Sequence, residues 1–217
     1  MPGTGAGLGV ALGWRSATLL LCVLGLLTDG WGTPFLSPQS NLLVAGYLAC
    51  CLYWMVRRRT PDAPAPTLRG LVTVTIVFVG LISHWTYDDA VNPLPGLTDP
   101  DPAAAIANQS AFLIHYVVPA MMLLDWLFLR PHGACSLRRA LLWPTYLIGY
   151  GVVITVRSIA LPHVWARYPV PMFDPSAGGW AAVALAVLGL AAGAYALALL
   201  LWWLDRLIAV RLIHHAP

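Results

Sequence analysis

The sequence contains no lysine and no glutamate, so its 12 basic residues are all arginine and its nine acidic residues are all aspartate. Charged residues make up only 10% of the chain, whereas a typical soluble domain has about 25%. So little charge cannot coat a water-facing surface. It also excludes the basic face or stripe that a nucleic-acid-binding protein requires.

Cysteine is scarce as well, with four residues in the chain. Cys22, Cys50 and Cys51 fall inside apolar runs, and Cys135 lies in a short basic segment. Neither a disulfide framework nor the spacing of a zinc site is present. We therefore interpret these residues as small apolar side chains and expect no metal and no bound cofactor.

Long apolar runs are abundant, since 59% of the 217 residues are hydrophobic and the mean hydropathy is +0.73. A membrane-spanning helix needs about 20 apolar residues. We predict an all-α polytopic membrane helix bundle that forms a single domain over residues 1–217, with spans at about 9–27, 37–56, 71–87, 110–129, 140–160 and 180–204. The first run could alternatively be a signal peptide, but no clear small-residue cleavage site follows it.

The arginines predict the orientation, because loops rich in basic residues stay in the cytoplasm. They gather in the loops after the second and fourth spans and in the C-terminal tail, with Arg57, Arg58, Arg59 and Arg69 in the first of these loops. The loop after the third span carries only aspartates, including Asp88 and Asp89. This alternation predicts that both termini are cytoplasmic. The bias toward arginine, alanine, glycine and proline is typical of proteins encoded by GC-rich genomes. It favours a bacterial source, and therefore a location in the bacterial inner membrane.

Two charged residues lie at similar depth inside the predicted spans near the cytoplasm, Arg15 on the first helix and Asp125 on the fourth. Isolated charges are costly in a bilayer and are usually paired or functional. We therefore predict a structural ion pair between them. Alternatively, Arg15 could extend its side chain to the interface.

Polar side chains also gather near the outer ends of several predicted spans. A polar pocket in the outer leaflet is the site hypothesis that this clustering favours. Its candidate lining residues are Gln39, Ser40, Asn41, His84, His115, Tyr116, Arg157, Tyr168 and Asp174. Ser37 precedes Pro38, which is also the pattern of a helix N-cap followed by proline at the first helical position.

Four stretches carry a family resemblance: Gln39-Ser40-Asn41-Leu42-Leu43, His115-Tyr116-Val117-Val118-Pro119, Leu124-Asp125-Trp126, and the run from Tyr168 to Pro175. Together they resemble the bacterial six-helix branch of the androgen-induced-gene and FAR-type integral membrane protein family. The resemblance covers most of the chain, from the second span to the start of the sixth. Animal members of that family hydrolyse fatty acid esters of hydroxy fatty acids with a threonine and a histidine.

The resemblance implies a lipid-ester hydrolase in which His115 matches the family histidine and Ser37 stands at the position of the threonine. Serine therefore replaces threonine here, and Pro38 follows it. A hydroxyl attacks an ester only when a neighbouring base takes its proton, which would be the role of His115. Membrane lipids would be the partners and a lipid-like molecule the substrate.

Other functions remain open from the residues alone. His84 and His115, at similar depth on successive helices, could ligate a haem. The same polar layer could serve a transporter or a small-ligand binding protein, although the two halves of the chain show no convincing repeat. A scaffold without chemistry is the fourth possibility, since Gly189-x-x-x-Gly193 permits close helix packing.

Overall fold

The computed structural model describes residues 4–28, 35–86, 91–176 and 178–214, and these form helices and connecting loops without a strand. Within this part of the chain, six stretches are long and apolar enough to cross a membrane. They comprise α1 (Thr4–Thr28), α2 (Leu36–Arg58), α3 (Pro66–Thr86), α4 with η2 and α5 (Pro102–Phe112, Leu113–Val117 and Val118–Phe128), α6 with α7 (Leu137–Ala140 and Thr145–Ala160), and α8 (Gly179–His214).

The prediction of a six-span membrane bundle is confirmed, and each helical stretch overlaps its predicted run almost completely. The predicted third span ended at Tyr87, which lies outside the described residues together with Asp88 and Asp89. The largest difference is in the fourth stretch, which begins at Pro102 and not near Ser110.

The additional turns of α4 extend beyond the rest of the bundle. Ser110 Oγ donates to Gly25 O at 2.7 Å, which places Ser110 level with the last turn of α1. Before it, Asn108 Nδ2 and Gln109 Nε2 donate to Gly96 O and Leu97 O of the 3-10 helix η1 (Leu94–Thr98). The segment before Ser110 therefore packs on its own connecting loop, and the part of the helix inside the bundle begins where hydropathy predicted.

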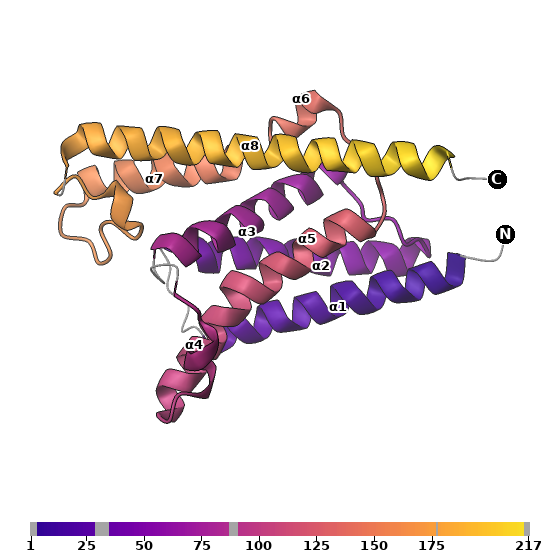
Figure 1. Cartoon of the computed structure of the whole chain (residues 1–217), viewed down its shortest axis with the longest axis horizontal. Helices are drawn as coiled ribbons and strands as arrows, with labels where there is room; N and C mark the ends of the chain where they lie inside the picture. The colour runs from indigo at the N-terminus through magenta and orange to yellow at the C-terminus, as the bar shows by residue number, and fades with distance from the viewer. Residues whose placement is uncertain (1–3, 29–34, 87–90, 177, 215–217) are drawn as a thin grey trace.

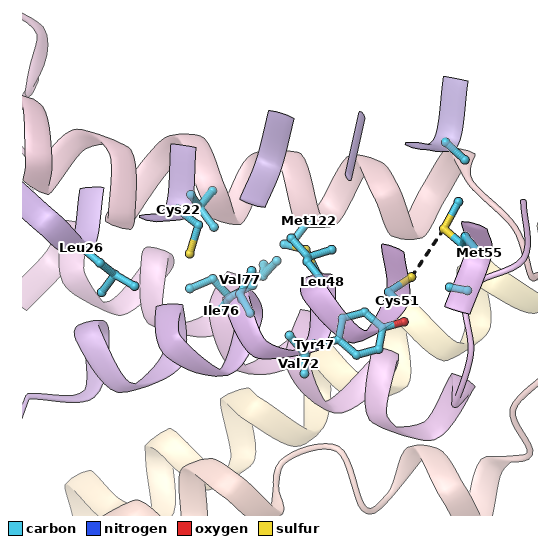
Figure 2. Packing of buried hydrophobic residues seen from close by; sticks show 14 residues of the cluster. Cys22, Leu26, Tyr47, Leu48, Cys51, Met55, Val72, Ile76, Val77 and Met122 are labelled. Carbon is cyan, nitrogen blue, oxygen red and sulfur yellow. Dashed lines mark hydrogen bonds between the residues drawn. The ribbon is translucent and has the colours of Figure 1, made fainter. Parts of the chain in front are cut away.

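The helices α1, α2, α3 and α5 form the main bundle, and α7 and α8 lie side by side along one flank (Figure 1). The start of α1 and the end of α8 lie at the same end, which we call the terminal end, and the opposite end is called the loop end (Figure 1). Figure 2 shows the packing of the main bundle, where Cys22, Leu48, Val72 and Met122 meet from four different helices.

The helix α8 is the longest element, with 36 residues, or about 54 Å at a rise of 1.5 Å per residue. Near its end lies the buried residue Asp205. Its Oδ2 accepts a hydrogen bond from Gly133 N at 2.8 Å, and its Oδ1 lies 3.1 Å from His132 Nδ1. These contacts fix the loop between α5 and α6 on α8. In the middle of α8, a Cβ at Gly193 would lie 3.2 Å from the ring of Phe78, whereas nothing lies within 4 Å of one at Gly189. Of the two glycines, Gly193 provides the close packing.

Candidate functional site

A cavity of about 450 Å³ lies between α3, α7 and α8, and the first turn of α2 closes part of its wall. The side chains that line it are mainly apolar, among them Phe78, Ile82, Val152 and Val187. The sequence predicted a polar pocket at this level. The cavity is instead apolar, because α7 and α8 contribute valine, leucine and alanine to its wall.

The cavity is elongated along α8. Its lining residues on this helix run from Trp180 to Ala194, a distance of about 21 Å along the helix axis. On α3 they run from Phe78 to Ser83, near the end of the helix at Thr86. The cavity therefore extends from the loop end toward the middle of the bundle.

Hydroxyl groups in the cavity wall come from Ser37, Ser83, Tyr150 and Thr155. Ser37 was expected either as a nucleophile or as the N-cap of α2. The cap interpretation is wrong, because α2 begins at Leu36 and its N-cap residue is Phe35, which makes no side-chain capping bond. Ser37 is the second residue of the helix and is 9% exposed.

A second, smaller pocket of about 270 Å³ lies between α3 and the η2–α5 segment. His84, His115 and Tyr116 are its polar lining residues, and His84 Nδ1 lies 2.8 Å from the Tyr116 hydroxyl. The ring of Tyr116 also stacks on Phe112, with centroids 5.4 Å apart. Two of the expected site histidines thus share one pocket with Tyr116.

The helix α3 separates the two cavities. Phe78, Val79, Ile82 and Ser83 line the large cavity, whereas Val77, Gly80, Leu81 and His84 line the small pocket. At about 100° per residue these two sets occupy opposite faces of the helix. Ser37 lines the large cavity and His115 lines the small pocket, so the structure does not place the side chains of this expected pair in one cavity.

Asn41 is buried and connects three segments. Its side-chain amide Nδ2 donates to Ser37 O at 3.0 Å and to Ile114 O at 3.2 Å, and the Cys22 thiol lies 3.5 Å from its Oδ1. Ser40 Oγ donates to Ser37 O at 2.9 Å. Asn41 and Ser40 therefore hold the start of α2 in place, and neither lines the described cavities.

The bond from Asn41 to Ile114 O has a cause in the backbone of η2, a π-helix. In a π-helix each N–H donates to the carbonyl five residues earlier, and Val118 N donates to Leu113 O in this way. The next amide in the same register belongs to Pro119, which has no N–H. Ile114 O therefore has no donor from its own helix, and Asn41 supplies one.

The other expected lining residues line neither described cavity and contact other protein groups. Tyr146 Oη donates to Gln39 Oε1 at 3.2 Å. Arg157 donates to the carbonyls of Ala166 and Trp165 in the loop after α7. Further along that loop, Arg167 lies over the ring of Tyr168, and Asp174 Oδ1 accepts from Ser176 N at 2.9 Å.

Arg15 and Asp125 form the ion pair that their depth predicted, with Arg15 Nε 2.7 Å from Asp125 Oδ1. Arg69 joins them, since its Nη2 lies 2.9 Å from Asp125 Oδ2. All three side chains are buried. Other guanidinium N–H groups donate to backbone carbonyls in the loops after α2 and α5, including Pro61 O and Pro131 O. This cluster fastens α1, α3 and α5 together near the terminal end.

Sequence reasoning placed Arg69 in a loop and so missed its part in the cluster. Hydropathy starts the third span at Leu71, but α3 begins at Pro66. Proline is common in the first turn of a helix. Pro66 was thus the signal that could have placed Arg69 inside the helix, one turn from its start.

Among the described residues, no group of three or more histidine, cysteine or acidic side chains could hold a metal ion. The features that can bear on function are the apolar cavity, the small histidine pocket and the buried charge cluster. Comparison of the chain with family models, curated proteins and solved structures finds no match.

Proposed function

We propose that this multi-pass membrane protein binds a lipid-like molecule in the large cavity. The observation that carries the proposal is a volume of about 450 Å³ lined mainly by apolar side chains of α3, α7 and α8. Ligand sites are typically mostly apolar cavities of about 300–1,000 Å³. The long axis of the cavity follows a membrane-spanning helix, which suits an acyl chain that lies parallel to its neighbours in the bilayer.

An opening of the cavity toward the lipid-facing side of the bundle supports a ligand that enters from the membrane. Val152 and Val156 on α7 and Val187 on α8 line the cavity and are also exposed on the surface of the bundle. In a bilayer this surface faces lipid tails. A lipid can therefore enter between α7 and α8 without leaving the hydrocarbon region.

The arginine distribution supports an orientation with the terminal end in the cytoplasm. Arg57, Arg58, Arg138 and Arg139 all lie in loops or last helical turns at that end. The cavity then lies in the outer leaflet, and the composition favours the inner membrane of a bacterium. Accessibility of single introduced cysteines to an impermeant thiol reagent in intact cells tests this orientation.

Filling the cavity tests the binding proposal. Ala191 lines the cavity and Ala192, the next residue of α8, is exposed and does not line it. We expect Ala191→Phe to reduce labelling by a photoactivatable lipid in vesicles, because the ring occupies the ligand's space. Ala192→Phe adds the same ring outside the cavity and should leave labelling unchanged. Equal labelling of both variants and the wild type would contradict the proposal.

Hydrolysis of a lipid ester bound in the same cavity is the second candidate. It is favoured by the position of Ser37 on the cavity wall and by the family resemblance of the sequence. Ser37 and His115 line different cavities, which counts against this histidine as the base. Fluorophosphonate labelling that disappears in Ser37→Ala and persists in Ser40→Ala would support a nucleophilic serine. If labelling also disappears in His115→Ala, the pair of Ser37 as nucleophile and His115 as base is supported. If the wild type is not labelled, ligand binding without hydrolysis is the remaining function.

A further inference from the structure

The hydroxyl groups of two buried residues in the cavity wall indicate which kind of lipid the cavity accepts. Ser37 and Ser83 are 9% and 2% exposed, and both line the cavity. Among the described residues, no hydrogen bond of either hydroxyl is found, and the bond at Ser37 is accepted by its backbone carbonyl from Ser40 Oγ. Thr155 differs, because its Oγ1 donates to Gly151 O at 2.8 Å, as hydroxyls in helices often do.

Neither oxygen is among the fully buried side-chain atoms without a partner in the described residues, so both are accessible from the cavity that they line. A hydroxyl that faces an apolar cavity without a partner is unfavourable. Both serines lie near the loop end, since Ser37 is in the first turn of α2 and Ser83 is in the last turn of α3. A ligand that places a hydrogen-bonding group at this end of the cavity would satisfy them. A pure hydrocarbon would not.

Charge gives the second restriction. Every residue that lines the cavity is uncharged. Arg157 belongs to α7, which forms part of the wall, but its guanidinium is bonded to the carbonyls of Ala166 and Trp165. A carboxylate, phosphate or ammonium group would enter this cavity without a counter-charge, which is strongly unfavourable in a low-dielectric site.

The shape gives the third restriction. From the serines at the loop end, the wall continues along α8 to Ala194 and contains no further hydroxyl beyond those of Tyr150 and Thr155 among its lining residues. This part suits a single extended chain.

We propose that the ligand is an uncharged, single-chain lipid that carries a hydroxyl or ester group. The polar group is hydrogen-bonded by Ser37 and Ser83, and the chain extends along α8 toward Ala194. This inference rests on the proposed binding function and adds the chemical class of the ligand.

The test compares three photoactivatable probes of equal chain length with the full-length protein in phosphatidylcholine vesicles. The probes are a fatty alcohol, the methyl ester of a fatty acid, and the free fatty acid at alkaline pH, where it is a carboxylate. We expect the alcohol and the ester to label the α8 segment 180–194 at least about tenfold more than the carboxylate. Ser37→Ala and Ser83→Ala should each weaken alcohol binding by about fivefold, the usual value of one hydrogen bond. Thr155→Val is the matched control and should have little effect, because its hydroxyl is already bonded within α7.

The outcomes separate the inference from the function on which it rests. Equal labelling by the carboxylate would overturn the requirement for an uncharged ligand. A preference for the alcohol that both serine variants retain would overturn the role of the two hydroxyls. Labelling of none of the probes, or labelling that Ala191→Phe does not reduce, would overturn the binding function itself. If a second copy of the chain filled the cavity, the protein would be a dimer that excludes the probes, which would also overturn the proposal.

Discussion

Replacement of Asn41 by leucine tests the relation between the π-helix and the start of α2. Leucine has a similar volume, so packing is largely kept while both Nδ2 hydrogen bonds are lost. Ser37 O retains its bond from Ser40 Oγ, whereas Ile114 O loses the donor given by Asn41. An unsatisfied buried carbonyl costs about 1–3 kcal/mol. Hydrogen bonds measured between membrane helices reach about 1.7 kcal/mol. We expect Asn41→Leu to lower the free energy of unfolding by about 1–2 kcal/mol.

A double-mutant cycle with Pro119→Ala provides the decisive measurement. Alanine at this position restores a backbone N–H that can donate to Ile114 O in the π register. Asn41→Leu should therefore cost about 1 kcal/mol less in the Pro119→Ala background than in the wild type. Ser40→Ala is the control, because Ser40 contacts Ser37 O and not the π-helix. Its cost should be the same in both backgrounds.

Unfolding in bicelles by added SDS, followed by tryptophan fluorescence, provides the four free energies for each cycle. Additive costs for Asn41→Leu and Pro119→Ala would refute the reasoning. They would mean that Ile114 O does not depend on Asn41 for its donor. A cost of Asn41→Leu below about 0.5 kcal/mol would lead to the same conclusion.

Three further predictions concern stability. Asp125→Ala leaves two buried guanidinium groups without their anion and should cost about 3–5 kcal/mol. Asp62→Ala breaks an exposed ion pair with Arg130 and should cost less than about 1 kcal/mol. Unfolding by SDS measures both costs. Gly80→Ala places a Cβ 2.6 Å from a carbonyl of the π-helix and should be destabilising, while Gly46→Ala, with nothing within 4 Å, should be neutral or stabilising. Asp205→Ala removes the acceptor that holds the α5–α6 loop, so limited proteolysis should cut this loop faster than in the wild type.

The membrane bundle could be predicted from the sequence because hydropathy and length determine which segments span. The ion pair between Arg15 and Asp125 also followed, since both positions could be counted from the ends of their spans. Counting residues gives depth along a helix axis but not direction around it. That Ser37 and His115 line different cavities could not be predicted for this reason.

The large cavity could not be predicted from the polar residues, because few of them line it. Its wall depends on how far α7 and α8 stand from α3, and that distance is set by tertiary packing. The π-helix was more accessible to prediction. A proline following His115-Tyr116-Val117-Val118 removes a backbone donor inside a helix, whereas the sequence placed Asn41 only among the candidate lining residues of the polar pocket.

The length of α8 has a practical consequence for membrane experiments. At about 54 Å, this helix is much longer than the roughly 30 Å hydrocarbon core of a bilayer. It accommodates the excess by tilting or by extending its last turns into the headgroup region, where Arg206 and Arg211 lie. Since α8 also forms the long wall of the cavity, its tilt and the shape of the cavity depend on bilayer thickness. Vesicles made from lipids of different acyl length are therefore expected to give different ligand affinities for the same unmodified protein.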